Sequence, residues 1–317
     1  TNVVNNIVDY VKFKYKYEIQ GNERNEIRKS LRKMFRTTNI KVLYKDFYNW
    51  LGKPDMFKMT KGSNYEYADV FPLTYLKIRL EGAAKFDKVK HLVIDEMQDY
   101  TPVQYRVIAA LFNCKKTILG DSNQSVNPFS SSTADSIAEV FPKSDRVYMN
   151  KSYRSTIEIT EFAQLIQRNE KLEPIERHGE IPIIKLCKSD EEEITEIRNE
   201  IKDFNSKEYK TFGIICKTQT QADFVYDQIK DISLDIYLLN SESYSFTNGI
   251  VITTAHMSKG LEFDQVLVPF GSKQNYKTEI DKHMLYVACT RAMHKLTVTF
   301  TGSNSKFLDN LVKQSVN

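Results

Sequence analysis

The chain has 317 residues, of which 41% are hydrophobic and 27% charged, so its composition is that of a globular protein long enough for two domains. No apolar stretch reaches the ~18–20 residues of a transmembrane helix, and we therefore expect a soluble, cytoplasmic protein without a membrane partner. The net charge of +4 is too small to predict a nucleic-acid partner by itself. The chain begins at Thr1 and not at Met, which is typical of a fragment of a longer protein.

Residues 1–80 predict a basic, mainly helical segment of undetermined packing. Residues 1–60 hold 13 Lys or Arg against 6 Asp or Glu. An arginine every four residues, with apolar residues on a second face, predicts an amphipathic helix with Arg24, Arg28, Arg32, Arg36, Ile27, Leu31, Met34 and Phe35. The arginines suit phosphates or an acidic partner, although a solvated helix face is the commoner explanation. The aromatic-rich stretch from Val42 to Tyr75 reads as irregular.

From residue 91 the pattern alternates between strands and helices. The expected strands are His91–Asp95, Thr117–Gly120, Arg146–Met149, Ile181–Leu186, Phe212–Cys216, Ile250–Thr254, Gln265–Phe270 and Leu296–Phe300. The expected helices are Pro102–Phe112, Ser155–Gln167, Glu191–Phe204, Gln219–Ile229 and Ile280–Ala292. This alternation predicts an α/β fold of parallel sheets flanked by helices, with a domain boundary near Pro142–Asp145. Ligands of such folds bind at the carboxyl ends of the strands.

The four cysteines are widely spaced and form no CxxC pair or zinc-like spacing with histidine. We expect reduced, mostly buried thiols at Cys114, Cys187, Cys216 and Cys289.

Two neighbouring strand ends carry the first candidate site. The segment His91–Asp99, HLVIDEMQD, runs from an apolar strand into carboxylates. Asp95 suits a Mg²⁺ held through water and Glu96 suits the orientation of an attacking water, but both could equally cap the following helix. The polar loop after the next strand, GDSNQS, places Gln124 where it could sense a terminal phosphate, or it is simply a turn.

Three later segments add positively charged side chains and an aromatic ring to the candidate site. In NKSYRS, Tyr153 could stack a purine and Arg154 could bind phosphate, although surface Tyr-Arg pairs are common. In ITTAHMSKGLEFD, residues 252–264, small polar residues with His256, Lys259 and Gly260 allow a phosphate chain to approach, and Glu262 can bind a sugar hydroxyl. A lone histidine is more often structural. Arg291, in LYVACTRA, could stabilise transition-state charge or merely complement the helix dipole.

In this order the segments resemble motifs II to VI of the UvrD/Rep/PcrA class of superfamily 1 helicases, over about Val89 to Phe300. The resemblance implies two RecA-like domains of the P-loop NTPase fold, of which the chain holds a partial first domain, 81–143, and a complete second domain, 144–317. It also implies an ATP-dependent DNA helicase as the full-length parent, with ATP and Mg²⁺ as cofactors and single-stranded DNA or DNA duplex ends as partners.

The same resemblance assigns roles residue by residue. It implies that Asp95 holds Mg²⁺, that Glu96 is the base, and that Gln124 senses the γ-phosphate. Arg154 and Arg291 correspond to the paired γ-phosphate arginines, and Tyr153 to the adenine-stacking ring. The nucleotide-facing residues of motif V are Lys259, Gly260 and Glu262, and its nucleic-acid-binding residues are Thr254 and His256.

Within this class, KSYRST at 151–156 and YADVFPL at 67–73 look most like the HelD branch, the relatives associated with RNA polymerase. The alternative function is therefore an RNA-polymerase-binding recycling factor that uses a helicase-like body as a binding module.

None of the 11 glycines begins or completes a GxxxxGKS or GxxxxGKT loop; Gly52 and Lys53, for example, are followed by Pro54. Because that loop provides the main grip on phosphates, we expect weak or undetectable nucleotide binding and no useful ATPase activity from these residues alone.

Overall fold

The structure is a computed structural model, and it describes residues 2–34, 39–59, 64–121, 124–125, 132–205, 209–232, 235–240 and 248–309. The chain forms two compact units. The first comprises Thr1–Lys90 with Val103–Lys115, and the second comprises His91–Pro102 with Lys116–Asn317. The domain boundaries expected from the sequence, after residues 80 and 143, stay predictions.

The first unit is helical. Its elements are α1 (Asn2–Tyr15), α2 (Gly21–Met34), α3 (Ile40–Trp50), η1 (Pro54–Met56), α4 (Tyr67–Glu81) and nearly all of α5 (Pro102–Leu111). The amphipathic helix expected around the arginine stripe is present as α2, where Arg24 bonds the side chain of Asn5 in α1 and Arg28 is exposed. Phe35 and Arg36 lie outside the described residues.

The expectation of irregular structure from Val42 to Tyr75 is wrong, because α3 and α4 occupy most of that stretch. Asn39 caps α3 by accepting hydrogen bonds from two backbone N–H groups. Tyr44 packs edge-on against Tyr48 at 5.1 Å between ring centroids, and its hydroxyl donates to Asp69 of α4 at 2.9 Å. Aromatic residues are weak helix formers in isolation, and here this packing outweighs that preference.

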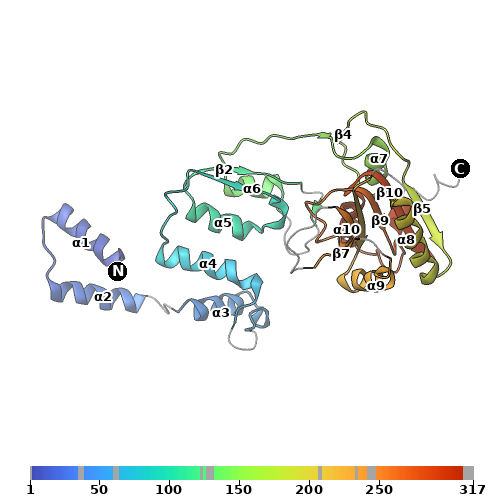
Figure 1. The fold of residues 1–317 in the computed structure, drawn as a ribbon. Helices are drawn as coiled ribbons and strands as arrows, with labels where there is room; N and C mark the ends of the chain where they lie inside the picture. The colour runs from blue at the N-terminus through green and yellow to red at the C-terminus, as the bar shows by residue number, and fades with distance from the viewer. Residues whose placement is uncertain are drawn as a thin grey trace. The chain divides into compact units, whose positions relative to one another are not determined.

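The second unit is built on a six-stranded, fully parallel sheet in the order β5-β10-β9-β6-β8-β7. Figure 1 labels β5, β7, β9 and β10 of this sheet. The strands are β5 (Ile183–Cys187), β6 (Thr211–Cys216), β7 (Ile236–Leu238), β8 (Gly249–Thr254), β9 (Phe263–Val268) and β10 (Ala292–Thr301). The helices are α7 (Ile157–Ile166), α8 (Asp190–Asn205), α9 (Gln219–Ile229) and α10 (Glu279–Cys289), with η4 (Lys306–Leu308) following β10. Parallel sheets flanked by helices confirm the predicted α/β fold.

The sheet has a hydrophobic core on each face because successive strand residues point to opposite sides. Ile215 and Val251 belong to the core that includes α7 and α10. Their neighbours Ile214 and Ile252 belong to the core that includes α8 and α9. Strands covered on both faces, such as β6 and β8, read as continuous apolar runs, which is why the sequence located them to within a few residues. The edge strand β7 was not expected.

The strand expected at Arg146–Met149 is wrong. These residues are not in a strand, and the side chains of Val147 and Met149 are 86% and 85% exposed. Pairing instead occurs between β3 (Lys151–Ser152) and β4 (Glu173–Pro174). A short apolar run forms a strand only where a partner strand pairs with it and covers its side chains. Local β-propensity does not reveal whether that partner exists. Helix α6 (Ala134–Val140), capped by Thr133 and Ser136, was not expected.

A two-stranded sheet of β1 (His91–Ile94) and β2 (Lys115–Ile118) precedes these elements, and η2 (Met97–Asp99) follows β1. Cys187, Cys216 and Cys289 are buried free thiols and Cys114 is partly buried, as expected. Across the residues that the structure describes, no helix is both long and apolar enough to span a membrane.

Candidate functional site

The carboxylates that follow β1 are not helix caps. Glu96 adopts a left-handed backbone conformation with φ of 54°, and its side chain makes no capping hydrogen bond to η2. Asp95 is exposed, and its Oδ1 accepts a hydrogen bond from the N–H of Glu96 at 2.8 Å. The turn after β1 therefore carries two adjacent carboxylates, and the side chain of Glu96 is not used to cap η2.

Gln98, which is fully buried, joins these acids to the loop after β2. Its Nε2 donates to Glu96 Oε2 at 2.7 Å, and its Oε1 accepts from the N–H of Asp121 at 3.1 Å. The backbones also meet, because the N–H of Met97 donates to the carbonyl of Leu119 at 2.8 Å. The two strand ends are therefore held together by side-chain and backbone hydrogen bonds.

Lys259, from the turn after β8, pairs with the acidic segment. Its Nζ lies 2.7 Å from Asp99 Oδ1 and 3.4 Å from Glu96 Oε2, and its side chain is only 8% exposed. The sequence predicted a nucleotide contact for Lys259. In the structure its ammonium group pairs with these carboxylates, and the nucleotide contact stays a prediction; the sequence did not single out Asp99 as its partner.

Gln124 and Arg291 are in direct contact. Arg291 Nη2 donates to Gln124 Oε1 at 2.8 Å, and Gln124 Nε2 donates to Asp121 Oδ2 at 3.1 Å. A second contact joins the same loop to α10, where His283 Nδ1 lies 2.9 Å from the carbonyl oxygen of Ser125. The polar loop after β2 is thus bonded to both the middle and the end of the α10 segment.

The Arg291 guanidinium is almost entirely removed from solvent, with the residue 1% exposed. Burial lowers the pKa of Arg291 to about 10, with the nearby charge of Arg154 acting in the same direction. It also donates to the carbonyls of Val287 and Leu261, at 3.2 and 3.4 Å, and to the hydroxyl of Thr290 at 3.3 Å. The group stays a cation at neutral pH, and in a dry setting such a charge acts strongly on a nearby anion.

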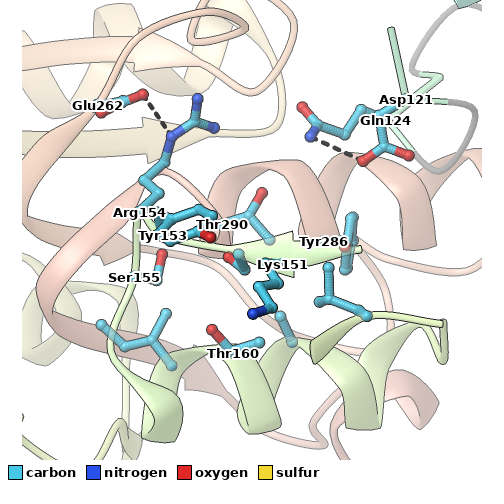
Figure 2. Close-up of a pocket in the computed structure, with 14 residues that line it drawn as sticks. Asp121, Gln124, Lys151, Tyr153, Arg154, Ser155, Thr160, Glu262, Tyr286 and Thr290 are labelled. Carbon is cyan, nitrogen blue, oxygen red and sulfur yellow. Dashed lines mark hydrogen bonds and ion pairs between the residues drawn. The ribbon is translucent and has the colours of Figure 1, made fainter. Parts of the chain in front are cut away.

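A pocket of about 540 Å³ lies beside this contact (Figure 2). Figure 2 shows Arg154 and Gln124 facing one another from opposite sides of it. The lining residues are Asp121, Gln124, Lys151, Ser152, Tyr153, Arg154, Ser155, Ile159, Thr160, Ala163, Leu172, Glu262, Tyr286 and Thr290. Arg154 Nε pairs with Glu262 Oε1 at 2.5 Å, and the Tyr153 side chain is available for stacking because it is 67% exposed. The pocket combines cations, apolar surface and an exposed ring.

Backbone contacts link the two arginine segments and the segment of Glu262. Ser155 Oγ donates to the carbonyl of Ala292 at 2.6 Å, and Ser155 is buried. The N–H of Phe263 donates to the carbonyl of Arg291 at 2.9 Å. The residues that follow Arg154 and Glu262 are therefore bonded directly to the segment of Arg291 and Ala292. Ser155 stands within the quoted motif YRS, so its position was visible in the sequence although its role was not.

The predicted strand-contacting residues differ in setting. Thr254 is buried, and its Oγ1 accepts from the N–H of Met257 at 3.2 Å, which shapes the turn after β8. His256 lies on that turn and is exposed. Gly260 has a φ of +80°, and a Cβ there would meet no atom within 4 Å. Its glycine is explained by backbone conformation and not by a close neighbour.

The donor set near Asp95 fits a magnesium ion that is shared with phosphates. Mg²⁺ binds proteins through one or two carboxylates and keeps several waters. Among the described residues there is no group of three or more His, Cys, Asp or Glu side chains that could hold a metal alone. Asp95 is an exposed carboxylate with one oxygen engaged by a backbone N–H, so it can offer the other to a metal-bound water. It does not line the pocket of Arg154 and Gln124.

Two family models match the chain. The UvrD/REP helicase N-terminal domain matches residues 14–144, and the UvrD-like helicase C-terminal domain matches residues 225–303. The first match covers the segments of Asp95, Glu96 and Gln124, and the second covers those of Glu262 and Arg291.

Several proteins resemble the chain. YjcD of Bacillus subtilis is 25% identical, over 62% of this chain and 26% of YjcD. F-box DNA helicase protein 1 of Schizosaccharomyces pombe is 23% identical, over 75% of this chain and 37% of that protein. ATP-dependent DNA helicase Rep of Buchnera aphidicola is 28% identical, over 43% of this chain and 22% of Rep. The matched part of each relative is thus well under half of its length.

A solved structure, the C-terminal domain of a "possible DNA helicase" from Lactobacillus plantarum, is also similar. It is 29% identical and covers 50% of this chain and 92% of that chain, with a TM-score of 0.43. At that TM-score the likeness adds nothing to the description of the site.

Proposed function

Because the chain carries UvrD/Rep-like superfamily 1 helicase domains, we propose that it supplies most of the ATP site and a DNA-binding turn of an ATP-dependent DNA helicase or translocase. The observation that supports this most directly is the contact between Arg291 and Gln124 beside the pocket of Arg154. A buried cation bonded to a neutral amide, next to a second arginine, is suited to an anion such as the terminal phosphate of ATP.

In this proposal each polar group has one task. Asp95 holds Mg²⁺ through water, and the ion would neutralise charge on the phosphates. Glu96 orients the attacking water, and Gln98 fixes its carboxylate by donating at 2.7 Å. Gln124 connects the terminal phosphate to Arg291, so that a change at the phosphate alters a contact between the loop after β2 and α10.

The pocket suits the rest of a nucleotide. Tyr153 offers an exposed ring for stacking on the base, and Glu262 can accept a hydrogen bond from a sugar hydroxyl while it holds Arg154. Gly260 gives the turn after β8 its positive φ. Lys259 influences the site through its ion pairs with Glu96 and Asp99.

The turn after β8 is the proposed contact with single-stranded DNA. His256 is exposed on that turn, and Thr254 shapes it from inside. Contacts to single strands combine stacking on rings with charge attraction to the backbone. Because Lys259 belongs to the same turn and pairs with Asp99, movement of the acidic segment can be transmitted to His256.

The sequence contains no GxxxxGKS or GxxxxGKT loop, and this chain alone is therefore proposed to be inactive as an ATPase. Phosphate release by the purified 317-residue chain, with and without single-stranded DNA, tests this directly. We expect no release above that of the Glu96→Gln variant. DNA-stimulated release that Glu96→Gln abolishes would show that the chain is a complete enzyme.

Binding of a fluorescent oligothymidine, followed by anisotropy at several salt concentrations, tests the DNA contact. We expect salt-sensitive binding that His256→Ala weakens about ten-fold, by loss of one base-stacking contact. His178→Ala is the matched control, because His178 is also exposed and pairs with Glu158. Equal affinity of wild type and His256→Ala would exclude the turn as the contact. Capture of RNA polymerase without affinity for single strands would favour the binding-module function instead.

A further inference from the structure

Arg177 lies in the stretch between β4 and β5, outside the segments that carry the proposed chemistry, and it holds the segment of Arg154 in two ways. Its Nη1 donates to the carbonyl oxygen of Arg154 at 2.9 Å. Its own carbonyl accepts a hydrogen bond from the N–H of Ile157, the first residue of α7, at 2.9 Å. Both ends of the four-residue segment from Arg154 to Ile157 are therefore bonded to a single residue.

The other arm of the same guanidinium reaches the start of β10. Arg177 Nη2 lies 2.9 Å from Nε2 and 3.1 Å from Nδ1 of His294, three residues after Arg291. A guanidinium is a rigid planar fork, so the directions of its two arms are fixed relative to each other. One rigid group therefore spans the backbone of Arg154 and the strand that follows Arg291.

His294 is itself held in place. The ring of Tyr209 stacks on it with centroids 5.6 Å apart and an angle of 17° between the planes. Burial lowers the pKa of His294, and the charge of Arg177 lowers it further, so the ring is neutral at pH 7 and a ring nitrogen can accept a hydrogen bond. Arg177 therefore bonds to an acceptor whose position is fixed.

We propose that Arg177 is a positioning residue that fixes the Arg154 guanidinium relative to Arg291. Ser155 provides the other connection between the two segments, through the carbonyl of Ala292. One contact is made at the carbonyl of Arg154, and the other at the side chain of the next residue, Ser155. That Arg177 thereby supports phosphate binding rests on the proposed function. That it holds the side chain of Arg154 in place does not.

The position of the Arg154 side chain can be observed without a nucleotide. Its Nε–H is the group that pairs with Glu262 at 2.5 Å, so its exchange with solvent reports how firmly the guanidinium is held. Arginine-selective ¹⁵N NMR of the 317-residue chain measures this rate, with the signal assigned by its loss in Arg154→Ala. In Arg177→Ala we expect exchange about ten-fold faster or more, because the ion pair opens more often.

Two variants make the result specific. Arg198→Ala removes a guanidinium that bonds Asp231 and the carbonyl of Gln228, and it should leave the Arg154 signal unchanged. Arg177→Lys keeps the charge but not the fork, and its exchange rate should lie between those of wild type and Arg177→Ala. Arg177→Lys also keeps the experiment decisive if Arg177→Ala does not fold. Unchanged exchange in folded Arg177→Lys or Arg177→Ala would overturn the proposal.

A double-mutant comparison distinguishes positioning from a direct contact with phosphate. The affinity of the chain for tripolyphosphate is measured by calorimetry for Arg177→Ala in the wild-type background and in the Arg154→Ala background. If Arg177 acts through Arg154, its replacement weakens binding only when Arg154 is present. Additive losses would contradict that coupling. If no protein binds tripolyphosphate, as the missing phosphate-binding loop allows, the NMR result alone decides the role of Arg177.

Discussion

Lys259 Nζ lies 2.7 Å from Asp99 Oδ1 although the two residues are 160 positions apart in the sequence. The same ammonium group is 3.4 Å from Glu96 Oε2. The turn after β8 and the acidic segment after β1 therefore share one buried cation. A divalent cation held by Asp95, as proposed, would add positive charge beside Glu96, one of the carboxylates that this lysine neutralises.

Lys259→Ala should make the stability of the protein depend on Mg²⁺. Without the ammonium group, Glu96 and Asp99 repel each other, and a bound ion relieves that repulsion. We expect added MgCl₂ to raise the thermal midpoint of Lys259→Ala by more than that of wild type, with the gain increasing with the logarithm of Mg²⁺ concentration. Lys230→Ala, which removes an exposed ion pair with Asp227, is the control and should respond as wild type does. Identical responses of all three proteins would mean that these acids do not bind Mg²⁺.

Gln124→Ala should destabilise the protein by about 1–3 kcal/mol, because it removes a hydrogen bond to a charged group and leaves the buried Arg291 guanidinium short of a partner. Gln124→Glu retains an acceptor oxygen and adds a charge opposite to that of Arg291, so its free energy of unfolding should fall much less. Urea unfolding of the variants measures both effects. Gln219→Ala is the control, because Gln219 makes only a surface contact with Asp223. Equal midpoints for Gln124→Ala and wild type would show that the contact contributes nothing to folding.

The sequence predicted the central strands of the parallel sheet because they are buried on both faces, whereas it missed the partly exposed edge strand β7. Strands such as β6 and β8 appear as runs of Ile, Val and Thr that no helix pattern resembles. It failed at Arg146–Met149, where apolar residues are exposed, and between Val42 and Tyr75, where tertiary packing of aromatic rings makes helices of a segment with irregular patterning.

For the candidate site, the sequence proposed residues but could not show their contacts. Gln124 and Arg291 were both predicted, and their direct hydrogen bond follows only from the fold. Lys259 was expected at the nucleotide because lysine and glycine together suggest phosphate, whereas the fold brings it to Asp99. Arg177 gave no signal, because its role depends on a backbone carbonyl and a histidine that is 117 residues away.

Gly120→Ala tests the close approach between the two strand ends. Gly120 has a φ of +159°, and a Cβ there would lie 2.5 Å from both Gln98 Oε1 and the backbone nitrogen of Met97. The backbone nitrogen cannot move without breaking its bond to Leu119, so we expect a loss of about 1–3 kcal/mol from overpacking. Gly21→Ala is the control, since no atom lies within 4 Å and the residue begins α2. Chemical unfolding should show that Gly21→Ala is as stable as wild type or slightly more stable. If Gly120→Ala is also as stable as wild type, the two strand ends are not closely packed.

Asp281 should make stability dependent on pH in acid, through α10, the helix that ends just before Arg291. Its carboxylate lies 2.6 Å from Lys217 Nζ and accepts hydrogen bonds from the N–H groups of Lys277 and Thr278. Burial by itself favours the neutral acid, but the hydrogen bonds and the charge of Lys217 outweigh it and lower the pKa of Asp281 from 3.8 to about 2. The ionised form is therefore favoured in the folded protein.

A folded-state pKa below the unfolded value contributes stability that is complete above pH 3.8 and disappears as the pH falls through about 2. The size of the contribution is about 2 kcal/mol. Asp281→Asn should therefore be less stable than wild type by about that amount between pH 5 and 7, with the difference shrinking below pH 4. Asp227→Asn, which alters an exposed pair with Lys230, should differ from wild type by less than about 0.5 kcal/mol throughout. Urea midpoints between pH 7 and 3 measure both differences. If the stability difference between wild type and Asp281→Asn stays constant down to pH 3, the carboxylate is not being protonated in that range. The lower stability of the variant would then come from the capping hydrogen bonds of α10 alone.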